Sequence, residues 1–170
     1  MDDDAPLLRA MPRGPLYALK GFITRVDLAL LTTIDEDGWF ATRAAIEADV
    51  DSKEVRLVVA ILCGTDVLVG PGGRFGFSSD IGPECEGLAA LKNLAKATAE
   101  RTCGHPVQGV ELAGYLNDDL EATLRHVFVL VYRARVPAGT AAPDGMSWVG
   151  KPALPKTEDP ISARISSLMA

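Results

Sequence analysis

The segment 84–103 carries charged side chains whose types and spacing could contact a phosphate group. Lys92, Lys96 and Glu100 follow one another at intervals of four residues, and Arg101 stands next to Glu100. Residues four apart share one face of an α-helix, so a helix here would present cations and a carboxylate together. Ammonium and guanidinium groups can bind phosphate oxygens directly. A solvated charged face without any function explains the same residues, and this alternative stays open.

Further carboxylates flank this segment and could supply oxygen ligands to a divalent cation. Asp80 precedes it, Glu84 and Glu86 lie in its first turn, and Asp118 and Asp119 follow an apolar stretch beyond its end. Mg2+ is usually held by one or two carboxylates together with substrate phosphates. Carboxylates at the start of a helix also interact favourably with the helix dipole. A helix-capping or solvated role therefore explains these side chains as well as a metal site does.

A glycine-rich stretch over residues 70–83 comes directly before the charged segment. Its sequence, GPGGRFGFSSDIGP, contains Arg74 and is too irregular for a helix. It is also too rich in glycine for a central strand. We therefore expect a loop, which either takes part in function or simply connects two elements.

Three cysteines, Cys63, Cys85 and Cys103, are widely spaced along the chain. They match neither a disulfide framework nor a C-x2-C metal-binding pattern, so we expect ordinary free thiols. A nucleophilic Cys103 assisted by His105 is the alternative. Closeness in sequence does not by itself bring an imidazole within reach of a thiol.

The overall composition favours a single acidic globular domain. The chain has 170 residues, with 17 Lys and Arg against 23 Asp and Glu, and a formal charge of −6. This length fits one domain, and the lack of excess cations argues against a nucleic-acid partner. The sequence shows neither a secretory leader pattern nor a long apolar run, so we expect a cytoplasmic protein without a membrane partner. We expect residues 1–14, which are acidic and interrupted by Pro and Gly, to be flexible, and residues 15–170 to form the domain.

The pattern of apolar residues predicts the elements that position these side chains. Helical spacing predicts helices over 26–34, 42–48, 84–103 and 160–169. Apolar, β-branched runs predict strands over 55–62, 107–116 and 127–136, and a turn at 64–66 predicts a hairpin to 67–69. Residues 137–156 are typical of a loop. This order of elements favours an α+β fold in which helices pack on a mixed sheet.

Several blocks of the chain, taken in order, resemble the Nudix superfamily, and more closely a bacterial branch described as predicted Nudix phosphoesterases. The similar blocks are DGWFATRAAIEAD at 37–49 with Lys53 soon after, GFSSDI at 76–81, and NDD at 117–119 with RHV at 125–127. The branch usually has two glycines and a histidine where this chain has Ser78, Ser79 and Asp80. The resemblance covers residues 21–149. It implies an α/β/α sandwich with a mixed β-sheet flanked by helices.

The Nudix box is the region where the sequence departs from this family. The family pattern is G-x5-E-x7-R-E-U-x-E-E-x-G-U, with U an aliphatic residue, and its carboxylates hold Mg2+ against a diphosphate that water attacks. When the pattern is anchored on Gly104, the positions expected to be acidic hold Ala89, Thr98, Arg101 and Thr102. When it is anchored on Gly82, it retains the cation Lys96 and the carboxylate Glu100, but it needs one extra residue before the last glycine.

The resemblance implies a small phosphorylated or nucleotide-like ligand and, if the protein is active, Mg2+. Glu100 is then the candidate catalytic residue, and Glu100 and Glu86 are the candidate metal ligands. The candidate ligand-binding residues are Arg74, Lys96, Arg101, Asp118 and Asp119. Because one box carboxylate beside two cations is a poor Mg2+ site, enzyme activity stays open. The alternatives are a Nudix-type diphosphate hydrolase, a protein that binds such a ligand without hydrolysing it, and an inactive regulatory or partner-binding protein. A homodimer also stays open.

Overall fold

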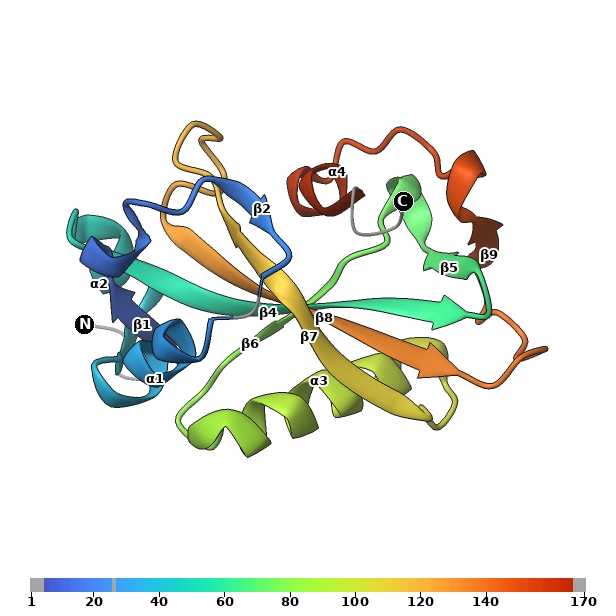
Figure 1. The fold of residues 1–170 in the computed structure, drawn as a ribbon, viewed down its shortest axis with the longest axis horizontal. Helices are drawn as coiled ribbons and strands as arrows, with labels where there is room; N and C mark the ends of the chain where they lie inside the picture. The colour runs from blue at the N-terminus through green and yellow to red at the C-terminus, as the bar shows by residue number, and fades with distance from the viewer. Residues whose placement is uncertain (1–4, 26, 167–170) are drawn as a thin grey trace.

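The computed structural model of the chain describes residues 5–25 and 27–166. Within these ranges nine strands form one sheet, whose main path is β2-β7-β8-β4-β1-β3, while β5 and β6 pair with β4 and β9 pairs with β5 (Figure 1). The strands are β1 Leu7–Pro12, β2 Gly21–Ile23, β3 Trp39–Thr42, β4 Ser52–Cys63, β5 Asp66–Val69, β6 Phe77–Asp80, β7 Gly109–Asn117, β8 Val127–Val136 and β9 Ser147–Gly150. The α-helices are α1 Leu28–Glu36, α2 Arg43–Ala48, α3 Gly87–Cys103 and α4 Pro160–Ile165.

β4 and β8 form a parallel pair at the centre of the sheet. Ten residue pairs lie in register, from Glu54 beside Val127 to Cys63 beside Val136. The strand pairs around them are antiparallel, so the sheet is mixed. Both central strands are mostly apolar and buried, as expected for strands covered on both faces over most of their length.

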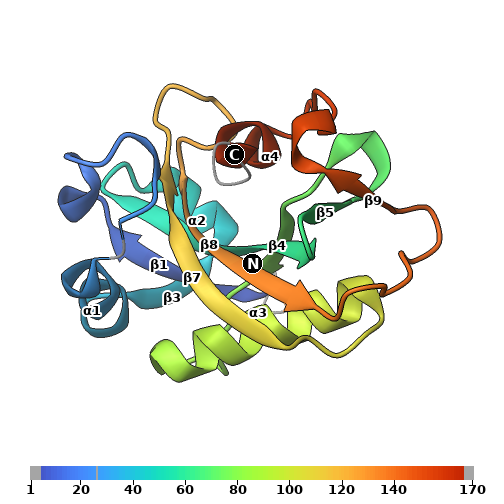
Figure 2. The same cartoon turned by 45° about the vertical axis from the view of Figure 1, so that its right-hand side comes forward.

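Alternate residues of β4 face opposite sides of the sheet. Leu57 packs in one core with Leu91 and Ala95 of α3, whereas Val58 packs in a second core with Ile161 of α4. Figures 1 and 2 show α3 on one side of the sheet and α4 on the other. The predicted α+β fold, with a mixed sheet flanked by helices, is confirmed.

The longest elements lie close to their predicted positions. β8 has the predicted bounds, β4 extends the predicted strand at both ends, and Leu62 pairs with Val67 in the predicted hairpin. α3 begins three residues later than expected and ends as predicted at Gly104, whose φ of 71° is the left-handed conformation that glycine favours at a helix end. Val26 and residues 167–170, at the outer limits of two predicted helices, lie outside the described residues.

The N-terminal segment differs from its prediction. Residues 1–14 were expected to be flexible, yet Leu7–Pro12 form β1, which lies between β3 and β4 and is mostly buried. The Arg9 side chain donates hydrogen bonds to the carbonyl oxygens of Ile34 and Asp35 at the end of α1, and it lies 4.8 Å from the centre of the Phe40 ring. The prediction was wrong here because the strand is short and its stability comes from its neighbours. Residues 1–4 lie outside the described residues.

The glycine-rich stretch is also more ordered than predicted. Residues 77–80 form β6, which pairs antiparallel with the middle of β4, so a strand interrupts the predicted loop. β2 and β3 were not predicted, and β9 lies inside the predicted loop over 137–156. These strands have only three or four residues, too few to show a period in the sequence. No helix in the described ranges is long and apolar enough to cross a membrane.

Candidate functional site

The last turns of α3 bring together three of the predicted site residues. Lys96 Nζ lies 3.9 Å from Glu100 Oε1, and Arg101 is exposed in the last turn. Glu100 Oε1 also accepts a hydrogen bond of 3.1 Å from the backbone N–H of Val107. The carboxylate expected to be catalytic therefore holds the chain where it leaves the helix.

The two predicted metal ligands lie at opposite ends of α3. Glu86 precedes the first helical residue, and Glu100 belongs to the last turn. At 1.5 Å per residue they are about 21 Å apart along the helix axis, whereas the ligands of one Mg2+ ion lie about 2.0–2.1 Å from it. Over the described ranges, no group of three or more His, Cys, Asp and Glu side chains could hold a metal ion. These residues do not fit the Mg2+ site that the resemblance implies.

Asp118 joins the turn after β7 to α4. Its Oδ1 accepts hydrogen bonds from the backbone N–H groups of Leu120 and Glu121, and its Oδ2 accepts one of 2.6 Å from Arg164 Nε. Burial alone would raise the pKa of the Asp118 carboxyl, but the hydrogen bonds from Arg164 and the backbone outweigh it and lower this pKa below its ordinary value. Asp118 is therefore a charged, fully engaged carboxylate.

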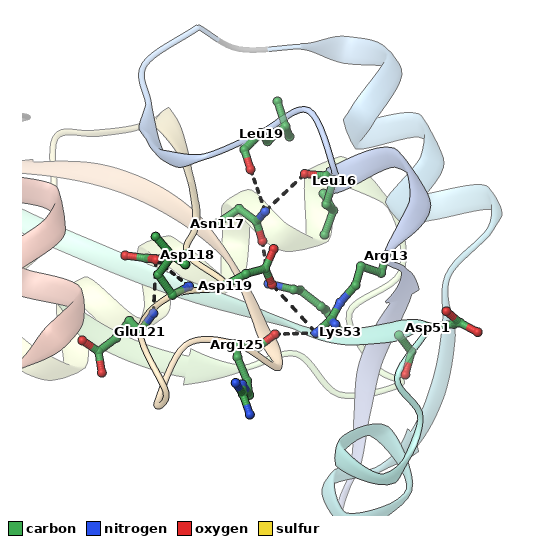
Figure 3. A network of polar contacts seen from close by, with 12 residues as sticks. Arg13, Leu16, Leu19, Asp51, Lys53, Asn117, Asp118, Asp119, Glu121 and Arg125 are labelled. Carbon is green, nitrogen blue, oxygen red and sulfur yellow. Dashed lines mark hydrogen bonds and ion pairs between the residues drawn. The ribbon is translucent and has the colours of Figure 1, made fainter.

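Asp119 pairs with a lysine that has no exposed side-chain surface. Lys53 Nζ donates a hydrogen bond of 2.6 Å to Asn117 Oδ1 and lies 2.8 Å from Asp119 Oδ1 (Figure 3). The Asn117 amide donates in turn to the carbonyl oxygens of Leu16 and Leu19, at 3.2 and 2.8 Å. Burial lowers the pKa of the Lys53 ammonium, and Asp119 opposes this shift. Lys53 thus links β4, the end of β7 and the segment after β1.

Arg13 extends this network on its outer side. Its guanidinium lies 3.9 Å from Asp119 Oδ1 and donates a hydrogen bond of 2.6 Å to the carbonyl oxygen of Arg125 (Figure 3). The Asp118–Asp119 turn follows β7, whereas α3 ends just before β7 begins. Because β7 spans about 25 Å at 3.3 Å per residue, the two aspartates are far from Glu100 and Arg101. The structure does not combine these predicted site residues into one site.

Asp80 belongs to a separate cluster that contains both positively and negatively charged side chains. Arg43 Nη2 donates to Asp80 Oδ1 at 3.2 Å, and the nearly buried Glu54 accepts from Arg43 Nε at 3.0 Å and Arg56 Nη2 at 2.7 Å. The hydrogen bond that Arg43 donates to Glu54 is the main reason why the pKa of Arg43 is raised. Two arginines and two carboxylates pair with one another here, so the cluster fastens β4, β6 and α2 together.

Cys103 is buried and has no imidazole partner among the described residues. Its Sγ contacts the backbone carbonyl oxygen of His105 at 3.2 Å rather than the ring. Cys63, Cys85 and Cys103 are free thiols, as predicted.

Arg74 lies in a charged hollow between the glycine-rich loop and the segment before α4. Thr157 of that segment donates a hydrogen bond of 3.2 Å to the Gly72 carbonyl oxygen, and Gly72 has a φ of 70° that lets the loop turn back. Arg74 Nε lies 3.9 Å from Asp159 Oδ1, which is too long for a hydrogen bond. The hollow has a volume of about 560 Å3, and it is lined by Pro71, Gly72, Arg74, Lys156, Glu158, Asp159 and Pro160.

A second, more apolar hollow meets the first at Lys156, which lines both. It has a volume of about 370 Å3, and the apolar residues that line it are Phe75, Leu154, Pro155 and Ala163. Ser162 Oγ of α4 accepts hydrogen bonds of 3.0 Å from the N–H groups of Phe75 and Gly76, which fixes the helix to the loop. Figure 2 shows α4 and the segment after β9 beside the loop that follows β5. We call the two hollows together the loop pocket.

The sequence indicated one wall of the loop pocket and missed the other. Arg74 was predicted as a ligand-binding residue. Lys156 was placed in the predicted loop over 137–156, and Glu158 was given no role. The available signal was a lysine and two carboxylates, KTED at 156–159, between two prolines just before a helix. The sequence does not show that this segment packs against residues more than 80 positions earlier.

Comparisons with known proteins bear on the fold. No protein-family model matches the chain, and no curated protein matches it. A solved structure described as "Crystal structure of Tm1382, a putative Nudix hydrolase" is similar to it, with a TM-score of 0.75, 16% sequence identity, and coverage of 96% of this chain and 98% of that chain. A "putative oxidoreductase (SMa0793) from Sinorhizobium meliloti 1021" matches 78% of this chain and 47% of that chain, with 13% identity and a TM-score of 0.46. The first likeness, together with the mixed sheet between helices, shows that the chain has a Nudix-like fold.

Proposed function

We propose that the protein binds a small phosphorylated, nucleotide-like molecule in the loop pocket. The observation that carries this proposal is the meeting of two different hollows at Lys156, one lined by charged groups and the other mainly by apolar ones. Each has a volume within the range of about 300–1,000 Å3 that is usual for small-molecule sites. A nucleotide has the same division, with a charged phosphate at one end and a flat, weakly polar base at the other.

The charged hollow suits the phosphate end of such a ligand. Arg74 and Lys156 are both exposed cations, and the ion pair of Arg74 with Asp159 is longer than a hydrogen bond. The guanidinium donors can therefore turn to an anion without losing a short contact. Hydrogen bonds between such cations and phosphate oxygens are about twice as strong as neutral ones.

The apolar hollow suits the base or another flat group. Leu154 and Pro155 contribute apolar surface, and the Ser162–loop hydrogen bonds hold this wall in place before a ligand arrives. A wall that is already fixed loses less conformational freedom on binding, which favours affinity.

Binding without hydrolysis agrees best with the residues of α3. The resembled enzymes need several helix carboxylates around Mg2+, and this helix presents Lys92, Lys96 and Arg101 with Glu100 engaged at Val107. A site with this donor set is suited to contact phosphate and poorly suited to hold the metal. A Nudix-type hydrolase and a partner-binding protein remain the two alternatives that the experiment separates.

Calorimetric titration with AMP, ADP and ADP-ribose, each with and without Mg2+, tests the proposal. We expect saturable binding that does not require Mg2+, and a loss of roughly tenfold or more in affinity for Arg74→Ala and for Lys156→Ala. Lys92→Ala, which removes an exposed cation on α3, is the matched control and should bind like the parent protein.

Two results would overturn the proposal. Mg2+-dependent turnover of a nucleoside diphosphate derivative that Glu100→Gln abolishes would establish hydrolysis at α3 instead. Absence of binding to all three compounds, measured also as absence of a thermal shift, would favour the partner-binding alternative, because a ligand of the native state raises its stability.

A further inference from the structure

Two arginines lie at the end of the β7–β8 ladder that is far from the Asp118–Asp119 turn. Arg133 and Arg135 are two residues apart on β8, so their side chains leave the same face of the sheet. Across the ladder, Glu111 of β7 stands opposite Arg133, and Gly109 stands opposite Arg135. This face is the one that α4 covers further along, where Val131 packs in the second core.

These residues surround a hollow that shares none of its lining with the loop pocket. Its volume is about 170 Å3, and its lining is Gly109, Val110, Glu111, Arg133 and Arg135. A Cβ atom placed on Gly109 would meet no heavy atom within 4 Å, so the space beside Arg135 is open. Because Gly109 has no side chain, there is room for a ligand over this face of the two strands.

The charges around the hollow are unbalanced in favour of cations. Glu111 Oε1 lies 2.9 Å from Arg133 Nη2 and 3.8 Å from Arg135 Nη2, so one carboxylate serves two guanidinium groups. Arg133 Nε is buried and has no hydrogen-bond partner among the described residues. A buried donor without an acceptor is unfavourable, and an added acceptor at this position would remove that penalty.

We propose that this hollow binds a phosphate group, either inorganic phosphate or the phosphoryl group of a phosphomonoester, between Arg133 and Arg135. Two adjacent guanidinium groups can offer paired N–H donors to the oxygens of one tetrahedral anion, which fits phosphate better than a single-atom anion. The dianion also complements the net positive charge of two arginines and one glutamate. Glu111 then turns outward, which its exposed side chain allows.

Nuclear magnetic resonance of the arginine Nε–H groups gives a site-resolved test. The full chain, labelled with 15N, is titrated with inorganic phosphate, with O-phosphoserine, and with sodium chloride at equal ionic strength. We expect saturable shifts of the Arg133 and Arg135 signals with phosphate or the ester and not with chloride. Tighter binding of inorganic phosphate would assign the site to the free ion, and tighter binding of O-phosphoserine would assign it to a phosphomonoester. The Arg74 signal reports separately on the loop pocket, so failure at one site leaves the other result unaffected.

Three variants sharpen the test. Arg133→Gln should weaken phosphate binding roughly tenfold or more, because it removes one charged donor group. Glu111→Gln should tighten binding by about threefold or more, because it removes the competing carboxylate and its repulsion. Arg135→Gln provides a second loss-of-charge variant should Arg133→Gln not fold. Shifts that grow linearly without saturation, or that chloride reproduces in full, would overturn the proposal, and so would unchanged affinity in Glu111→Gln.

Discussion

The substitution Asp119→Asn tests whether the buried ammonium of Lys53 depends on its carboxylate partner. Removing one partner of a buried ion pair costs about 3–5 kcal/mol. Two observations reduce this figure, because the Asp119 side chain is 45% exposed and Lys53 keeps the Asn117 oxygen at 2.6 Å. We therefore expect a loss of about 2 kcal/mol in the free energy of unfolding. For a domain of this size the melting temperature should fall by about 4–8 °C.

The pH dependence of this loss follows from the lowered pKa of Lys53. Its ordinary value is 10.5, and burial lowers it in the folded state. Between the lowered value and 10.5 the unfolded chain binds more protons than the folded one, so stability rises with pH in this window. Asp119→Asn removes a partner that raises the pKa, so the folded variant releases its proton at lower pH. The loss in the free energy of unfolding caused by Asp119→Asn should therefore be smaller at pH 9.5 than at pH 7.

Urea denaturation followed by circular dichroism at the two pH values measures both effects. Asp144→Asn, which neutralises an exposed carboxylate on the loop before β9, is the matched control and should change stability by less than about 0.5 kcal/mol. The double variant Lys53→Met/Asp119→Asn leaves no buried charge and should recover most of the loss. A loss of less than about 0.5 kcal/mol for Asp119→Asn at pH 7 would refute the reasoning, as would a loss that increases with pH.

Three further changes test contacts elsewhere in the fold. Arg9→Met removes the hydrogen bonds at the end of α1, so we expect a loss of about 2 kcal/mol and faster amide hydrogen exchange in the last turn of that helix. Ser162→Ala leaves two buried N–H groups of the glycine-rich loop without an acceptor, so the urea midpoint should fall by an amount equivalent to about 1–3 kcal/mol. Glu100→Ala should cost about 1 kcal/mol in thermal denaturation, while millimolar Mg2+ should shift the melting temperature of neither this variant nor the parent. A stabilising effect of Mg2+ that Glu100→Ala removes would contradict the geometry of α3.

The sequence was sufficient to locate elements whose residues are buried or periodic over a long stretch. β4 and β8 were predicted because central strands with cover on both faces become continuous apolar runs. α3 was predicted because its apolar stripe repeats over several turns and ends at Gly104. β1 and β6 were missed because a strand of four to six residues takes its stability from neighbours that the local sequence does not reveal.

The candidate site was predictable only where one segment carried the information. Arg74 could be singled out because it stands among glycines, whereas Lys156 joins it through the packing of α4 on the sheet. Asp119 was predicted to bind a ligand, and nothing in the sequence indicates that Lys53 of β4 pairs with it instead. Residue type can suggest a charge, but the partner of that charge depends on tertiary packing.

The parallel pairing of β4 with β8 has a consequence for how the chain folds. Glu54 and Val127, the first partners of this ladder, are 73 residues apart in the sequence. Closing so long a loop costs conformational entropy before any contact compensates it, and parallel sheets with distant partners fold slowly for this reason. During synthesis, β4 must wait until β8 has left the ribosome, while α3 and the β4–β5 hairpin can form earlier. The apolar side chains of β4 are therefore exposed for a long time during synthesis, which makes this protein a candidate for chaperone assistance.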